Sequence, residues 1–251
     1  MIELNISSAS RVGCVRHNNE DMILVKDQFI RNAEYRTVIS LTETDRCMVA
    51  VADGMGGHKS GEVASHDALH NLQYFFSDLP VGLDPSAFNE MILEWLDSIN
   101  MIIDSKGKVD DRYKGMGTTL VAIAFYDGEF YSMNCGDSRL YRYREGNLEQ
   151  LTTDHSLSNL MGERQHSNII TNCIGGGCTS SFVDMVQMTD DVADGDIYLL
   201  CSDGLSDMIS DAQIAKLIGD GADADELCNE AIACGGYDNV SACLIKVNKE
   251  N

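Results

Sequence analysis

The stretch that most constrains the fold is an apolar run that ends abruptly in an acidic, glycine-rich loop. Residues 47–52 carry no charge and are typical of a strand buried on both faces. Asp53 follows, and three of the next four residues are glycine, which lets a ligand approach the backbone closely. A carboxylate beside exposed carbonyl oxygens suits a hard cation. An Asp-Gly turn between a strand and a helix would have the same sequence, so this stretch alone leaves both interpretations open.

Two other kinds of glycine-rich loop do not fit this stretch. A phosphate-binding P-loop has glycine immediately before its Lys-Ser pair, whereas His58 precedes Lys59 and Ser60 here. A dinucleotide-binding loop spaces its glycines differently, and Asp53 would place a negative charge beside the pyrophosphate. The loop therefore binds a cation or serves only as a turn.

The composition narrows the classes of function. The chain has 251 residues, with 40 acidic and 18 basic side chains, and the net charge of -22 argues against binding of nucleic acid. No apolar run is long enough to span a membrane and the first residues do not resemble a signal peptide, so we expect no membrane association. The nine cysteines are odd in number and scattered, which favours free thiols and a cytoplasmic location.

Apolar periodicity predicts strands, two helices, more strands, two further helices and a last strand. The clearest helix begins after Asp84, a good N-terminal cap, with Pro85 in its first turn and Trp95 on its core face. The other expected helices cover residues 63–76, 210–218 and 223–233. The expected strands cover residues 2–6, 22–25, 35–41, 47–52, 118–126, 129–135, 139–143, 148–151, 182–188, 197–201 and 240–247.

Hairpins dominate this order of elements. The Asp127-Gly128 turn between two apolar strands is a strong hairpin signal, whereas residues 152–178 show little periodicity and are expected to form a loop region. No low-complexity linker or internal repeat divides the chain. We therefore predict an α+β fold with layered antiparallel sheets, formed as a single domain by residues 1–251.

Acidic residues stand where buried strands end or begin. Asp53 and Asp203 each close a buried strand, and Asp238 opens one. The pair Glu20-Asp21 also adjoins a strand, and Asp137 follows another. One such residue is commonly a turn former, but five strand-end sites suggest convergence at one edge, where repulsion would forbid burial without cations. Ligands that are all oxygen favour Mg²⁺ or Mn²⁺ over Zn²⁺, and two such ions can hold a phosphoryl group.

Ordered motifs across nearly the whole chain connect this constellation to a known family. They are Arg16-x-x-Asn19-Glu20-Asp21, Asp53-Gly54-Met55-Gly56-Gly57-His58, Gly117-Thr118-Thr119, Cys135-Gly136-Asp137-Ser138-Arg139, Ser202-Asp203-Gly204-Leu205 and Asp238-Asn239. In this order they resemble the PPM family, the PP2C-type metal-dependent protein serine/threonine phosphatases, in its bacterial single-domain branch. The resemblance implies a four-layer αββα sandwich of two antiparallel β-sheets flanked by helix pairs. It also implies hydrolysis of phosphoserine and phosphothreonine by a water that two metal ions activate.

The resemblance assigns roles to the acidic residues. Asp53 corresponds to the carboxylate that bridges two Mn²⁺ or Mg²⁺ ions, and Gly54 to the residue whose carbonyl joins the second ion. The other implied ligands are Asp203 and Asp238 for the first ion, Glu20 and Asp21 beside the second ion and its waters, and Asp137 for a weaker third ion. Arg16 corresponds to the guanidinium that clamps the substrate phosphate, so Arg16, Asp53 and Asp203 form the expected catalytic set. Thr118 and Thr119 are expected to support the sheet, and Asn239 to orient a ligand.

Two departures from the family pattern affect the expected chemistry. Animal members carry a histidine, proposed as general acid, where Met55 stands here, and the nearby His58 is at least as readily a packing residue. The segment between His155 and Ile169 is shorter than the flap of bacterial relatives, which bears on substrate recognition and on the third ion. The implied partners are phosphorylated proteins and a cognate Ser/Thr kinase, and a monomer is expected.

Two other functions are compatible with parts of the sequence. A pseudophosphatase, which binds a phosphoprotein without catalysis, could lose its ligands, yet every core acidic position is present. A two-metal nuclease is opposed by the charge of -22 and by the lack of a basic groove. No cysteine is followed by arginine at the spacing of a Cys-x5-Arg loop, so a phosphocysteine intermediate is not expected.

Overall fold

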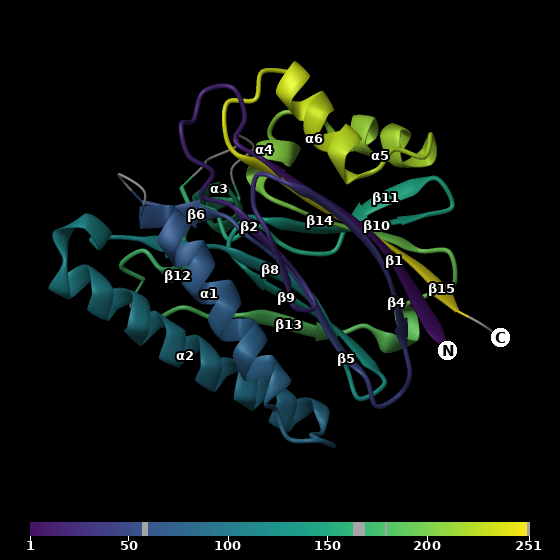
Figure 1. The fold of residues 1–251 in the computed structure, drawn as a ribbon, viewed down its shortest axis with the longest axis horizontal. Helices are drawn as coiled ribbons and strands as arrows, with labels where there is room; N and C mark the ends of the chain where they lie inside the picture. Colours follow the sequence, from purple (N-terminus) through teal and green to yellow (C-terminus); the bar gives the residue numbers. More distant parts are fainter. Residues whose placement is uncertain (57–59, 163–168, 179, 250–251) are drawn as a thin grey trace.

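Two six-stranded antiparallel sheets lie face to face at the centre of the molecule, as the computed structural model shows for residues 1–56, 60–162, 169–178 and 180–249 (Figure 1). The first sheet has the order β11 (Asn147–Gln150), β10 (Arg139–Arg144), β14 (Ile197–Cys201), β15 (Val240–Lys249), β1 (Ile2–Arg11) and β4 (Glu34–Leu41). The second has the order β13 (Asp184–Gln187), β9 (Glu129–Cys135), β8 (Leu120–Tyr126), β5 (Arg46–Ala52), β2 (Met22–Val25) and β3 (Gln28–Ile30).

Helices cover the outer face of each sheet. The long helices α1 (Ser60–Ser77) and α2 (Pro85–Val109) lie on the second sheet, with Leu72 and Trp95 in that core. The helices α4 (Asp203–Ser206), α5 (Asp211–Gly219) and α6 (Ala224–Ala233) lie on the first sheet. A third core, which includes Val49 and Ile245, fills the space between the sheets. These layers confirm the predicted αββα sandwich.

Local sequence explains where the helices begin. The Asp84 side chain accepts a hydrogen bond from the Ala87 amide at 2.9 Å, and Pro85 is the first residue of α2. Ser210 begins α5 with a capping box, as expected. None of the helices in the described residues is long and apolar enough to cross a membrane.

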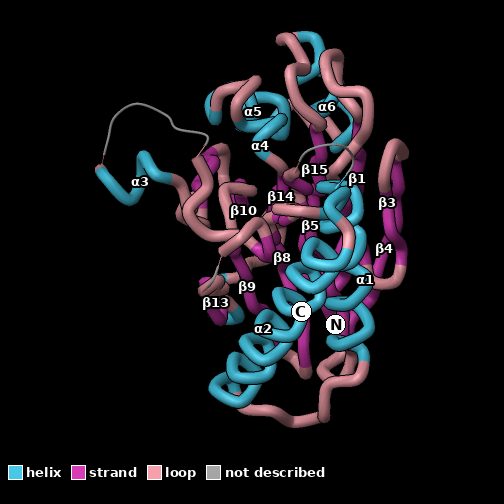
Figure 2. Tube along the Cα trace, turned by 90° about the vertical axis from the view of Figure 1, so that its left-hand side faces the viewer, coloured by secondary structure: helices cyan, strands magenta, loops and turns pink. Residues whose placement is uncertain are grey.

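The segment expected to be a loop contains two short elements. Ser156 caps α3 (Leu157–Met161), which stands away from the two helix layers in Figure 2. Farther along, β12 (Ile174–Gly175) joins β7 (Gly117–Thr118) and β6 (Gly54–Met55) in a three-stranded sheet. A two-residue strand has no periodicity of its own, so its pairing with distant segments could not be read from the sequence.

Candidate metal centre

The strand register brings the strand-end acidic residues together at one end of the sandwich. Met22 of β2 pairs with Ala52 of β5, so the preceding Asp21 and the following Asp53 adjoin each other. Cys201 of β14 pairs with Ala242 of β15, which places Asp203 close to the start of β15. Electrostatic coupling among Asp21, Asp53 and Asp203 follows from this arrangement. The register therefore brings these three aspartates to the same end of the sandwich.

Asp21 is a fully buried carboxyl group with only part of its hydrogen-bonding capacity used. Its Oδ2 accepts a hydrogen bond from the Ser202 hydroxyl at 2.8 Å, whereas Oδ1 has no partner among the described residues. The pKa of Asp21 is raised to about 7, mainly by burial, with the charges of Asp203 and Asp238 adding to the rise and the hydrogen bond from Ser202 opposing it. An unpaired buried oxygen of this kind is costly unless something else binds it.

Hydrogen bonds to its backbone hold Asp53 in place at the end of β5. The Thr118 hydroxyl and the Thr119 amide both donate to the Asp53 carbonyl oxygen at 2.9 Å. The Asp53 amide in turn donates to Thr119 Oγ1 at 3.0 Å. Burial raises the pKa of the Asp53 carboxyl well above its ordinary range, with further contributions from the negative charges of Asp21 and Asp203. The two threonines thus support the backbone of the candidate ligand.

Asp203 and Asp137 extend the acidic cluster. Burial, together with the charges of neighbouring carboxylates, raises the pKa of Asp203 to about 6 and that of Asp137 to about 7. Asp203 Oδ1 is buried without a hydrogen-bond partner among the described residues. Asp207 contributes to both shifts, and it was not anticipated from the motifs.

Two glycines are required where the backbones of the site approach one another. A Cβ atom on Gly54 would lie 2.1 Å from the Gly61 carbonyl oxygen and 2.6 Å from that of Glu20. A Cβ atom on Gly204 would lie 1.8 Å from the Asn239 carbonyl oxygen. Both distances are far below van der Waals contact, so each Asp-Gly motif packs in a way that only glycine permits.

Arg16 and Asn239 connect the loop before β2 with the start of β15. Arg16 Nη2 lies 2.6 Å from Asp238 Oδ2, and more than half of the arginine side chain is exposed. Asn239 Oδ1 accepts a hydrogen bond from the Glu20 amide at 2.8 Å, while its Nδ2 donates to the Asn18 carbonyl at 2.9 Å. Asn239 therefore holds the acidic pair, in keeping with the orienting role expected of it.

Buried hydroxyl and amide groups behind the carboxylates were missed by sequence reasoning. The Ser241 amide donates to Ser202 Oγ at 3.0 Å, and Asn19 Nδ2 donates to Ser10 Oγ at 2.8 Å. Ser10 and Ser241 are fully buried within long strands. Ser241 stands within the apolar first half of β15, and a serine in such a run is the signal that could have identified this network.

The chemistry of the donor set fits divalent cations of the Mg²⁺ or Mn²⁺ kind. The cluster is formed by carboxylates, with the unpaired oxygens of Asp21 and Asp203 among them. In the part of the chain that the structure describes, no three Asp, Glu, His or Cys side chains are already gathered closely enough to hold an ion. Backbone carbonyls and waters would therefore complete any coordination shell.

Two expectations reach beyond the described residues. His58 lies outside them, and so do residues 163–168 of the segment considered as a short flap. Met55 is half-buried in β6, where it pairs with Gly117 of β7. Its thioether carries no proton at any ordinary pH, so Met55 cannot act as a general acid.

Comparison with known proteins identifies the family. A model of the family described as Protein phosphatase 2C matches residues 35–230. The protein phosphatase PhpP of Streptococcus pneumoniae is 33% identical, with 99% of each chain covered. The chain therefore belongs to the protein phosphatase 2C family, and the resemblance noted in its motifs is confirmed.

Solved structures of similar proteins agree with this assignment. The serine/threonine phosphatase of S. agalactiae has a TM-score of 0.79 at 28% identity, with 97% of this chain and 99% of that chain covered. The catalytic domain of PstP, the Mycobacterium tuberculosis serine/threonine phosphatase, was solved in complex with two manganese ions. That domain has a TM-score of 0.75 at 30% identity, with 99% of this chain and 100% of that chain covered.

Proposed function

We propose that this protein is a metal-dependent phosphatase that removes phosphate from phosphoserine and phosphothreonine in proteins. The observation that carries the proposal is the group of buried and half-buried strand-end carboxylates, in which Asp21 and Asp203 each keep a buried oxygen without a hydrogen-bond partner among the described residues. Five acidic sites at one edge repel each other unless cations neutralise them. Membership of the protein phosphatase 2C family supports the reaction class.

The residues that would hold two Mn²⁺ or Mg²⁺ ions are Asp53, the Gly54 carbonyl, Asp203, Asp238, Glu20 and Asp21. When bound, the ions supply charge that stabilises the phosphoryl group and lowers the pKa of water. Asp21 and Asp203, whose pKa values are raised to about 7 and about 6, release protons when cations bind. Arg16 stands at the exposed rim, where its planar guanidinium can bind two phosphoryl oxygens.

Finer assignments belong to the same proposal. Asp137 would hold a weaker third ion, because its buried carboxyl group lies beside Asp203. The substrates would be phosphoproteins made by a cognate Ser/Thr kinase.

We further propose that residues 1–251 act as one domain, that the protein is a monomer and that it works in signalling in the cytoplasm. The three cores shared by the two sheets and their helices support the single domain.

Phosphate release from a phosphothreonine peptide tests the proposal directly. We expect turnover with Mn²⁺ or Mg²⁺ and its loss in EDTA, with recovery when the metal is returned in excess. Full activity in EDTA would contradict the two-metal mechanism. If Mn²⁺ binds but no phosphate is released with either metal, the pseudophosphatase alternative replaces the proposal.

A further inference from the structure

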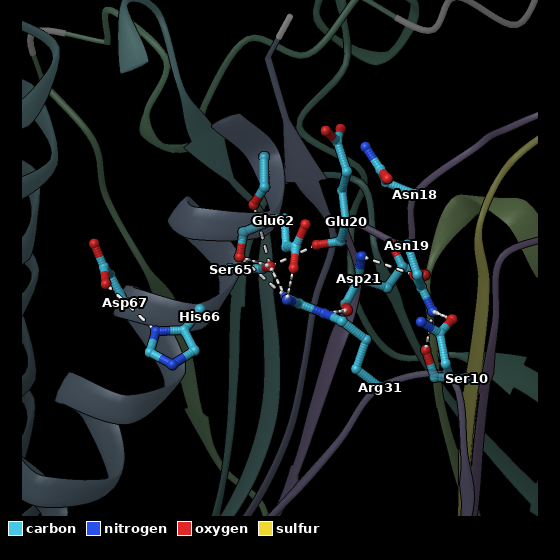
Figure 3. Close-up of polar contacts among 12 residues, drawn as sticks. Ser10, Asn18, Asn19, Glu20, Asp21, Arg31, Glu62, Ser65, His66 and Asp67 are labelled. Atoms are coloured by element: carbon cyan, nitrogen blue, oxygen red, sulfur yellow. Dashed lines mark hydrogen bonds and ion pairs between the residues drawn. The ribbon is translucent and has the colours of Figure 1, made fainter. Parts of the chain in front are cut away.

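Arg31, which directly follows β3, connects two segments that flank the candidate metal centre. Its Nε donates to the Asp21 carbonyl oxygen at 2.7 Å. Its Nη2 donates to the Glu62 carbonyl oxygen at 3.0 Å and to Ser65 Oγ at 2.8 Å, and Nη1 lies 3.3 Å from Glu62 Oε1. Figure 3 shows the guanidinium between the acidic segment and the first turns of α1.

Ser65 completes the connection from the helix side. Its side chain is fully buried, and its hydroxyl donates to the Glu20 carbonyl oxygen while it accepts from Arg31. The carbonyls of Glu20 and Asp21 are therefore each held by one of these two side chains (Figure 3). The acidic pair and α1 are fixed relative to each other by this arrangement.

The same two segments enclose Gly54. The Glu20 and Gly61 carbonyl oxygens both lie so close to Gly54 that a Cβ atom would meet them at 2.6 and 2.1 Å. Glu20 Oε2 in turn lies 2.7 Å from the position of a Cβ atom on Gly61. Because these backbones are in contact, a shift of the acidic pair relative to α1 must also displace Gly54.

We propose that Arg31 is a positioning residue for the metal centre, acting with Ser65 to set the distance from the Glu20-Asp21 pair to Gly54. The inference rests on the proposed function, since these residues matter as a group only if they bind cations. Arginine is suited to the task because its planar fork donates to several acceptors in different directions. A lysine ammonium at the same place would reach only some of them.

Arg46 provides a matched control at the other end of the same layer. It is also a largely buried arginine, 17% exposed against 15% for Arg31, and it also donates to backbone carbonyls, those of Leu79 and Pro80 beyond the end of α1. It begins the seven-residue strand β5 that Asp53 follows, so about 20 Å separates it from the candidate site. Its loss should destabilise the fold without touching the metal centre.

The test compares Arg31→Ala, Arg31→Lys, Ser65→Ala and Arg46→Ala with the wild type. Calorimetric titration of the metal-free proteins gives Mn²⁺ affinity, and phosphopeptide hydrolysis gives the Mn²⁺ concentration for half-maximal rate, kcat and KM. We expect Arg31→Ala to weaken Mn²⁺ binding about tenfold, Arg31→Lys to recover part of the loss, and Ser65→Ala to act in the same direction. Arg46→Ala should lower Tm but change Mn²⁺ affinity by less than about twofold, because distant sites rarely couple.

The outcomes separate this inference from the proposed function. If Arg31→Ala lowers Tm as Arg46→Ala does but keeps wild-type Mn²⁺ affinity, Arg31 only stabilises the fold and the inference is wrong. If Arg31→Ala does not fold, Arg31→Lys and Ser65→Ala provide the test. Wild-type Mn²⁺ affinity in both of these variants would also overturn the inference that Arg31 positions the metal centre. If the wild type itself binds no Mn²⁺ and releases no phosphate, the proposed function fails.

Discussion

Two buried aspartates in this molecule have similar exposure and opposite electrostatics. Asp21 is 0% exposed and Asp196 is 1% exposed. Asp196 accepts hydrogen bonds from Arg144 Nε at 2.6 Å and Nη2 at 2.7 Å and from the Ala193 amide at 2.8 Å. Burial alone would raise the pKa of Asp196, but the Arg144 guanidinium together with the hydrogen bonds from the Ala193 amide and the Tyr198 hydroxyl outweighs it, and the pKa is lowered. Arg31 donates to the backbone carbonyl of Asp21, and no hydrogen bond from a cation to the Asp21 carboxylate is found among the described residues, so its pKa is raised to about 7.

This difference shows that burial of an acid does not by itself make a binding site. The two ends of β14 show this difference within one sheet. Asp196, which is paired with an arginine, precedes the strand, and Asp203, which belongs to the acidic cluster, follows it. At one end an arginine neutralises the carboxylate, and the result is a structural ion pair. At the other end Asp203 faces several carboxylates and only the Arg16 charge opposes them among the causes of its raised pKa, so we expect a bound cation to supply the remaining positive charge. Substitutions at the two ends of β14 should therefore have different consequences.

The largest expected effect is on turnover. Asp203→Asn should lower kcat by about a hundredfold or more, because it removes a carboxylate that would hold one of the two ions. Asp196→Asn should leave kcat close to the wild-type value although it weakens the fold. Phosphopeptide kinetics at saturating Mn²⁺ measure both, with circular dichroism as the check on folding. Near-normal turnover in Asp203→Asn would show that the metal centre is misplaced.

A smaller effect is expected at the exposed rim. Arg16→Ala should lower kcat/KM by about tenfold or more, since a charged hydrogen bond is worth about 1.5–3 kcal/mol. Lysine should restore part of the activity, because it supplies charge without the planar fork. Small phosphate esters and phosphopeptides should suffer alike, since both present the same group. A defect confined to phosphopeptides would place Arg16 in protein recognition instead.

The two buried acids should respond oppositely when neutralised in the metal-free protein. Asp196→Asn should lower the free energy of unfolding by about 1–3 kcal/mol, because it weakens charged hydrogen bonds to Arg144. Asp21→Asn should raise Tm in EDTA, because it removes one charge from a repelling cluster. Thermal unfolding in EDTA at pH 7.5 compares the two. Equal destabilisation by both substitutions would mean that the charge of Asp21 is stabilised by its surroundings as well as the charge of Asp196 is.

The pH dependence of stability sharpens the same contrast. In the folded protein Asp21, Asp137 and Asp203 have pKa values of about 7, 7 and 6, above the ordinary value for aspartate. Their stabilising protonation is complete at low pH and is lost as pH rises through 6 to 7. Tm in EDTA should therefore fall from pH 5.5 to pH 8, whereas Tm in saturating Mn²⁺ should change little. A metal-free Tm that rises over this range would contradict the raised pKa values.

The acidic residues of the candidate metal centre are easier to find in the sequence than the residues around them, for a physical reason. Asp53, Asp203 and Asp238 stand next to buried strands, so apolar runs reveal where they lie. Asp196 also stands next to a buried strand, so the same pattern would wrongly include it among the candidate metal ligands. The sequence does not show that Arg144 reaches Asp196 from a neighbouring strand. Arg31 is likewise an unremarkable residue in the sequence, since its contacts depend on how α1 packs against the second sheet.

The layered fold was predictable because hairpins and amphipathic helices are local patterns. The clear capping signals at Asp84 and Ser210 fixed the starts of α2 and α5. In contrast, β12 and β6 consist of two residues each and exist only through pairing with β7. Pairing between short distant segments depends on the assembled backbone, so the sequence alone could not reveal it.

The most direct test of the central claim is proton release on metal binding. Mn²⁺ is titrated into the metal-free protein at pH 6.5 by calorimetry, in two buffers with different ionisation enthalpies. The account predicts binding of two ions with net release of protons, because carboxyls such as Asp21 are partly protonated before the ions bind. Asp196→Asn should release the same number of protons and Asp21→Asn fewer. Absence of Mn²⁺ binding, or binding with no buffer dependence, would contradict the claim that these buried acids await a cation.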